Sequence, residues 1–370
     1  MKRTEKQFFS LLRSGLTGTE PDPALFSGSV DWNAIYVLAD AQAVVPIVTD
    51  GIDGLPAGHK PSIEVLEPFL ADVLATEIRN DTVNHFASAL FRKVNALCPV
   101  LMVKGQGLAR LYPHPRHRQP GDIDLLVVPA HYEKVRDYLL SKTRCADTEY
   151  TDILHQGMSF GSIEVEVHGT VSTLMSVSLD RKMAALMEKM FAEEDFVVES
   201  FEEVPVRTPG PLFNAVYILV HFLHHYWSGG VGLRQLMDWG LYVTRHYEEL
   251  VAGPLESVLK DLGIFRLWQT FAGLCVARLG YDKTRFPFYT DRYKGKYEGI
   301  VRYILKSGNF GKNKPVRASK PGMYLLRKIS SFWRLVVCDR LRHFPEFPLE
   351  SLRYFFGATH YGLIRLSEGE

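Results

Sequence analysis

The segment 121–127, GDIDLLV, constrains the fold of this 370-residue chain more than any other stretch. Alternate side chains of a strand share a face, so Asp122 and Asp124 point one way while the isoleucine between them points into the core. Their Cα atoms would lie about 6.5 Å apart, and without a cation two such carboxylates repel each other. Magnesium prefers carboxylates combined with substrate phosphates. The segment therefore predicts a strand whose polar face binds divalent ions.

A glycine turn follows an apolar run at 99–103. Lys104 and Gly105 come directly after this run, which indicates a buried strand that ends in a turn. A glycine there lets the backbone approach a phosphate, and a helix beginning there offers free N–H groups. Because glycine turns are common, this motif gains meaning only beside the aspartate pair.

A third polar face is predicted at 163–168, IEVEVH. Strict alternation places its three aliphatic residues toward the core and Glu164, Glu166 and His168 on the opposite face. Alternation cannot choose between Glu166 and Glu164 as a third carboxylate for the ion site. An edge strand with a solvated face would show the same pattern.

Helical periodicity surrounds this strand-rich segment. Residues 1–95 follow mostly helical spacing, interrupted by a loop at 50–61, and residues 206–370 return to it. Between them, residues 96–205 show the order strand, helix, strand, helix and hairpin. We therefore predict an α/β (α+β) fold, in which a catalytic core with a small mixed sheet at 96–205 lies between an N-terminal helical region at 1–95 and a C-terminal helical domain at 206–370.

Together these motifs resemble the nucleotidyltransferase superfamily, which has a polymerase-beta-like fold. The chain is most similar to an uncharacterised bacterial nucleotidyltransferase family that often occurs among surface-polysaccharide genes. The similar positions are Lys104-Gly105, Leu108-Ala109 and Tyr112; Arg118 and Asp122-Ile123-Asp124-Leu125-Leu126-Val127; Glu166-Val167-His168; and the later segment 230–239, GVGLRQLMDW. Asp31-Trp32 and the segment 308–311 are also similar, so the resemblance covers most of the chain.

The resemblance implies metal-dependent transfer of a nucleotidyl group from a nucleoside triphosphate, ATP among the candidates, to an unknown acceptor hydroxyl, with release of pyrophosphate. It assigns Asp122, Asp124 and Glu166 as catalytic ligands of two Mg²⁺ ions, with Mn²⁺ as an alternative. The acceptor would be a small molecule, a glycan or a protein. Contacts to the nucleotide are expected from Lys104, Gly105, Gln106, Arg118, His168 and Arg234.

One position departs from the family pattern. The glycine motif usually continues with serine or glycine, whereas Gln106 follows Gly105 here. The hydroxyl that would hold the triphosphate is therefore missing, and Gln106 or backbone amides would have to replace it. This departure favours a rival hypothesis, a catalytically silent nucleotide- or glycan-binding module on the same fold.

Three further features allow two interpretations each. His221 and His225 share a helix face and would either bind a metal ion or have a structural or substrate-lining role. Arg234 and Asp238 are also four residues apart, so they would form an internal ion pair or bring Arg234 to the nucleotide. The basic amphipathic segment 327–342 would pack on the protein or dock on a membrane surface.

Charge and cysteine content argue against several other classes. The formal net charge is +1, so no overall basic field favours long nucleic acid as a partner. The four cysteines form no CxxC pair, which fits a reducing compartment without a zinc or disulfide framework. The sequence shows no secretory leader and no run of about 18 apolar residues. We therefore expect a cytoplasmic protein.

Overall fold

The computed structural model describes residues 1–147, 149–150, 153–311 and 341–368. Most of the basic segment 327–342 falls outside these residues. In the described part, no helix has the length and apolar character needed to cross a membrane. The helices are α1 (Arg3–Thr17), α2 (Trp32–Ala41), α3 (Val45–Asp53), α4 (Ile63–Val94), α5 (Gly105–Ala109), α6 (Pro129–Leu140), α7 (Val177–Ala192), α8 (Pro211–Ser228), α9 (Leu233–Arg245), α10 (Tyr247–Ala252), α11 (Leu255–Leu262), α12 (Phe265–Leu274), α13 (Tyr297–Ser307) and α15 (Pro348–Glu368).

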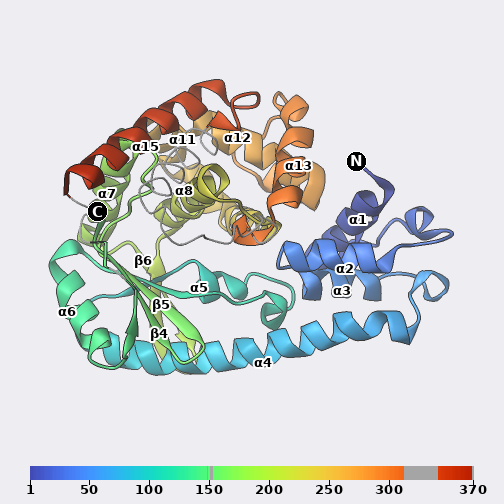
Figure 1. The fold of residues 1–370 in the computed structure, drawn as a ribbon, viewed down its shortest axis with the longest axis horizontal. Coiled ribbons are helices and arrows are strands. Elements are labelled where there is room, and N and C mark those ends of the chain that lie inside the picture. Colours follow the sequence, from blue (N-terminus) through green and yellow to red (C-terminus); the bar gives the residue numbers. More distant parts are fainter. Residues whose placement is uncertain (148, 151–152, 312–340, 369–370) are drawn as a thin grey trace, which may run out of the picture.

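The described chain contains a seven-stranded mixed sheet between α4 and the C-terminal helices, which confirms the predicted α/β (α+β) class (Figure 1). Its order is β3-β4-β5-β2-β1-β7-β6. β2 pairs parallel with β5, and β1 pairs parallel with β7; the remaining neighbours are antiparallel. The strands are β1 (Leu101–Val103), β2 (Ile123–Leu126), β3 (Cys145–Ala146), β4 (His155–Phe160), β5 (Ile163–His168), β6 (Phe196–Phe201) and β7 (Val204–Pro209).

One face of the sheet packs against α4 and α6. Figure 1 shows α4, in light blue, running beneath the sheet from the N-terminal helices. The apolar side chains that alternate with the aspartates of β2 lie on this face, as the sequence predicts. The cluster includes Ile123, Leu125 and Val127 with Val165 and Val167 of β5, Val83 and Phe91 of α4, and Val135 of α6.

The other face of the sheet carries the polar residues and lies under α8 and α9. Leu101, Val103 and Leu126 join the core of the C-terminal helices from this side. The core is rich in aromatic residues, and Trp227, Trp239 and Trp268 are fully buried in it. This layer of helices makes the sheet face beneath it a covered site rather than a solvent-exposed surface.

The N-terminal helices differ from the prediction in one place. The sequence predicts a loop over the Gly- and Asp-containing segment 50–61, yet α3 continues to Asp53. Close packing explains this difference: a Cβ on Gly51 would lie 2.0 Å from the backbone oxygen of Leu11, and one on Gly15 would lie 1.8 Å from that of Ile47. The glycines let α1 and α3 touch backbone to backbone, so tertiary packing outweighs the poor helix propensity of glycine.

The hairpin β6–β7 was not predicted, although it adds the outer strands beside β1. Its turn residues Glu202 and Glu203 both have positive φ, 45° and 67°. Such two-residue turns usually contain Asn, Asp or Gly, so a Glu-Glu pair gives no recognisable turn signal. β7 also extends to Pro209, four residues past the predicted core boundary at 205.

Gly51→Ala should destabilise the protein because the added methyl group has no room at the α1–α3 contact. We expect the free energy of unfolding to fall by about 1–3 kcal/mol, the usual cost of overpacking. Chemical denaturation measures this change. Gly58→Ala is the matched control, since a Cβ at Gly58 would have no atom within 4 Å, and equal midpoints for the two variants would contradict the packing argument.

Candidate active site

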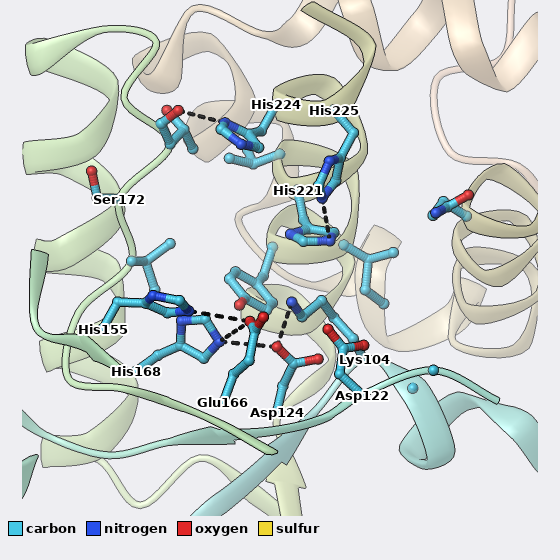
Figure 2. A pocket seen from close by; sticks show the side chains of 18 of the residues that line it. Lys104, Asp122, Asp124, His155, Glu166, His168, Ser172, His221, His224 and His225 are labelled. Atoms are coloured by element: carbon cyan, nitrogen blue, oxygen red, sulfur yellow. Dashed lines mark hydrogen bonds and ion pairs between the residues drawn. The ribbon is translucent and has the colours of Figure 1, made fainter. Parts of the chain in front are cut away.

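The three predicted carboxylates lie on adjacent parallel strands. Asp122 directly precedes β2, Asp124 lies within it, and the register pairs Asp124 with Glu166 of β5. One carboxylate oxygen from each residue lies within 4.8 Å of the other two. Figure 2 shows the three side chains pointing into one pocket. The sequence-predicted set therefore comes together with the spacing of a cation site.

Glu164, the alternative third carboxylate, lies away from this group. Its side chain is exposed, and both of its oxygens accept hydrogen bonds from Oγ of Ser159, at 2.8 and 2.7 Å. Glu166 is half-buried and lines the pocket. Both residues share a face of β5, so only the tertiary arrangement distinguishes them.

Lys104 follows β1 in a backbone conformation that lysine rarely adopts, with φ at 56°. This turn directs its ammonium group at the carboxylates, and Nζ lies 2.7 Å from Oδ1 of Asp124. The Nζ atom also lies 5.9 Å from the ring centre of Tyr217 on α8. Strained residues of this kind cost about 1–3 kcal/mol and cluster at functional sites. The buried ion pair with Asp124 supplies a compensating interaction.

The local charges are not balanced. Repulsion by Asp124, reinforced by burial, raises the pKa of Asp122 to about 6, although Lys104 partly offsets it. Burial lowers the pKa of Lys104, but Asp124, Tyr217, Asp122 and Glu166 together outweigh burial and raise it, so Lys104 stays protonated. The raised pKa of Asp122 shows that Lys104 does not fully offset the repulsion between the carboxylates, which a bound cation would relieve.

Two imidazoles hold Glu166 in place. Nε2 of His155 lies 3.2 Å and Nε2 of His168 lies 3.3 Å from its Oε2, and the latter nitrogen also lies 2.9 Å from Oδ1 of Asp124. Burial alone would raise the pKa of Glu166, but the hydrogen bonds from both histidines outweigh burial and hold it well below its usual value. Burial would lower the pKa of His168, whereas its two carboxylate partners raise it. Glu166 therefore stays ionised.

A buried ion pair connects the loop before β2 with α9. Nε and Nη2 of Arg118 lie 2.8 Å from the two carboxylate oxygens of Asp238, and the hydroxyl of Tyr112 donates to Oδ1 at 2.7 Å. The hypothesis of an ion pair between Arg234 and Asp238 is thus replaced by a pair with Arg118. Arg118 lines the pocket, but its guanidinium group is already paired with Asp238.

Arg234 lies in the same pocket beside Gly121. Its Nη1 donates to the backbone oxygen of Gln119, and 6% of the residue is exposed. Within the described residues, no carboxylate lies at ion-pair distance from it, and its Nε is buried without a hydrogen-bond partner. Burial, reinforced by repulsion from Arg118, lowers its pKa. Arg234 is therefore a pocket cation without an acidic partner among the residues that the structure describes.

The two residues of the glycine turn, Gly105 and Gln106, face different parts of the structure. Gly105 lines the pocket with φ at 44°, and a Cβ there would lie 3.1 Å from the backbone oxygen of Asp122. The side chain of Gln106 instead turns toward α4, where its Nε2 donates to Asn80 and Asn84 at 3.1 and 2.6 Å. The sequence predicts that either the Gln106 carboxamide or backbone amides bind the triphosphate in place of the missing serine. Because the carboxamide is turned toward α4, backbone amides are left for that role.

Helix α8 forms the opposite wall of a cavity of about 580 Å³. His221, His224 and His225 face the cavity, and the Nε2 atoms of His221 and His225 lie 3.1 Å apart (Figure 2). Burial lowers the pKa of both these residues well below the usual value, so they are neutral. The sequence pointed to this pair, but not to Tyr217 or His155. The cross-strand position of His155 opposite His168 was the missed signal.

Comparison with known proteins gives one match. The model of a protein family described as an uncharacterised nucleotidyltransferase matches residues 28–280. This region is more than half of the chain and contains the whole sheet and every residue that lines the cavity. Curated proteins and solved structures give no match.

Asp122→Asn should stabilise the metal-free protein at neutral pH. The folded-state pKa of about 6 exceeds the unfolded value, so ionisation of Asp122 destabilises the fold as pH rises from about 4 to 6. Asparagine does not ionise, and we expect a gain of about 1–3 kcal/mol at pH 8 that disappears at pH 4. Denaturant titrations in the presence of a chelator measure it. A gain of the same size at both pH values would refute carboxylate repulsion as its cause.

Proposed function

The chain belongs to this uncharacterised nucleotidyltransferase family, and on that basis we propose that it transfers a nucleotidyl group from a nucleoside triphosphate to an acceptor hydroxyl. The observation that carries the proposal is the group of Asp122, Asp124 and Glu166 inside a covered cavity. In the proposed reaction, the acceptor oxygen bonds to the α-phosphorus and the bond to the β-phosphate oxygen breaks. Pyrophosphate leaves, and the acceptor proton passes to a carboxylate or to water.

The set of three carboxylates fits two Mg²⁺ ions, with Mn²⁺ as an alternative. Asp122, Asp124 and Glu166 would be the ligands, because their oxygens lie close together and their charge exceeds that of Lys104. Two such ions would stabilise the attacking and leaving oxygens of an in-line displacement. The low pKa of Glu166 supports a ligand role for it more than a role as proton acceptor.

Arg234 is the residue best suited to bind the triphosphate. Its guanidinium has no acidic partner at ion-pair distance among the described residues and lies beside Gly121, whereas Arg118 is engaged by Asp238. A phosphate would supply the missing counter-charge and accept from the buried Nε or its neighbours. Backbone N–H groups after Gly105 and the ammonium of Lys104 would complete the phosphate contacts.

The acceptor side is proposed to lie along α8. His221, His224 and His225 form that wall across the cavity from the carboxylates. Neutral imidazoles can donate or accept hydrogen bonds, which suits a hydroxyl of a small molecule, a glycan or a protein. A role in surface-polysaccharide synthesis, a cytoplasmic location and membrane docking remain hypotheses from the sequence.

A catalytically silent nucleotide- or glycan-binding module is the second candidate. Gln106 favours it, since this residue faces α4 and leaves the glycine turn without a side-chain ligand for the triphosphate. The intact carboxylate group favours the enzyme, because a module that binds without turnover has no need of three converging carboxylates. The two candidates share nucleotide binding and differ in pyrophosphate release.

Nucleoside triphosphate and Mg²⁺ should stabilise the protein jointly. The metal relieves repulsion at Asp122, and the triphosphate completes its coordination, so either alone should have a small effect. At a hundredfold excess over the dissociation constant, we expect a gain of about 2.7 kcal/mol, a rise in Tm of several degrees. Thermal unfolding with each of the four nucleotides measures it. Asp124→Asn should abolish the joint effect, and additive or absent effects in the unaltered protein would refute the proposal.

Glu166→Gln should reduce metal-dependent pyrophosphate release by about 100-fold or more, a loss typical of one electrostatic contact to the transition state. Glu164→Gln is the matched control, because it removes an equal charge from the same strand but outside the cavity. The assay uses the nucleotide that stabilises the protein best, with hydroxyl compounds, glycans and proteins as acceptors. Loss of turnover in Glu164→Gln alone would transfer the third-ligand role to Glu164.

A further inference from the structure

The hairpin β4–β5 brings a second set of metal-binding groups to the edge of the cavity. The antiparallel register places His155 directly opposite His168, and their ring centres lie 4.7 Å apart. Glu166 precedes His168 by two residues and therefore shares its face of the strand. All three line the cavity, and their side chains are 22%, 15% and 31% exposed, in the order His155, His168, Glu166. They are accessible from the cavity yet fixed by the hairpin.

The spacing of the three ligand atoms matches a transition-metal site. Nε2 of each histidine lies 3.2 or 3.3 Å from Oε2 of Glu166, and all three atoms lie within 4.8 Å of one another. Ligands bonded to a tetrahedral ion at about 2.0–2.1 Å are separated by about 3.3 Å. We propose that His155, Glu166 and His168 bind a divalent transition-metal ion of the Zn²⁺ and Co²⁺ class, leaving a coordination position open to the cavity.

The chemistry of the donors separates this site from the magnesium ligands proposed above. Two imidazole nitrogens suit borderline transition metals, whereas Mg²⁺ prefers carboxylates, phosphates and water. Asp122 and Asp124 supply oxygen ligands, and Glu166 lies between the two sets. The histidine site would therefore hold its own metal in the absence of nucleotide, and it does not depend on the proposed transferase activity.

The local charge also supports a bound cation at the histidines. Asp122, Asp124 and Glu166 face the single ammonium group of Lys104, while His155 and His168 lie against two of these carboxylates. A divalent ion would replace the hydrogen bonds from the two Nε2 atoms with coordination bonds to the same nitrogens. The competing interpretation is that the histidines only position Glu166 through hydrogen bonds, with no metal of their own.

Titration of the chelator-treated full-length protein with Co²⁺ separates these interpretations, because histidine-bound tetrahedral Co²⁺ absorbs visible light strongly. We expect one equivalent to produce this absorption without nucleotide, and about a hundredfold excess of Mg²⁺ to leave it in place. His155→Gln should weaken Co²⁺ binding by about 100-fold, since even outer partners of metal ligands contribute 10–100-fold. His168→Gln should do the same, and circular dichroism checks that both variants are folded.

Two controls locate the ion. His221 and His225 on α8 are another closely spaced histidine pair in the cavity. His221→Gln alters this pair and should leave the Co²⁺ absorption unchanged. Asp122→Asn should also retain it while losing the joint effect of nucleotide and Mg²⁺, so failure of the transferase proposal is distinguishable from failure of this one. Loss of the absorption in His221→Gln, or Co²⁺ binding that persists in both His155→Gln and His168→Gln, would overturn the proposed site.

Discussion

The parallel pairing of β2 with β5 is the constraint on which the rest of the site depends. It places Asp124 beside Glu166 and concentrates negative charge on a sheet face that α8 and α9 cover. Asp124 is only 1% exposed, so the repulsion between the carboxylates is poorly screened. Three side chains lie against these carboxylates and offset that charge. They are Lys104, which follows a strained turn, and the imidazoles of His155 and His168. The opposite, apolar face of the same strands anchors the arrangement on α4 and α6.

The sequence predicted what depends on local alternation and missed what depends on contacts between distant segments. Period-two patterning placed Asp122 and Asp124 on one face, and it left Glu164 and Glu166 equivalent until the fold separated them. Arg118 and Arg234 were both expected to contact the nucleotide, but no local pattern shows that Asp238 engages Arg118. His155 lay unnoticed because its importance comes from its cross-strand partner.

Helix α4 illustrates the same limit. Apolar spacing through Leu70, Leu74 and Ile78 predicted a helix, and residues 63–94 form one. These three side chains are nevertheless 43%, 58% and 57% exposed. The buried residues Val83, Ala87 and Phe91 come later, where the helix runs under the sheet. Periodicity thus specifies the helix, while the position of its packing partners determines which part of it is buried.

The buried pair of Arg118 and Asp238 determines how the cavity can move. Separating α9 from the loop before β2 would break this buried pair, and a buried pair whose partner is lost costs about 3–5 kcal/mol. At that cost, fewer than roughly one molecule in a hundred would have α9 separated from the loop before β2. Ligands therefore meet a cavity that is already shaped, and selection among them rests on the fixed outline of its walls rather than on closure around each one.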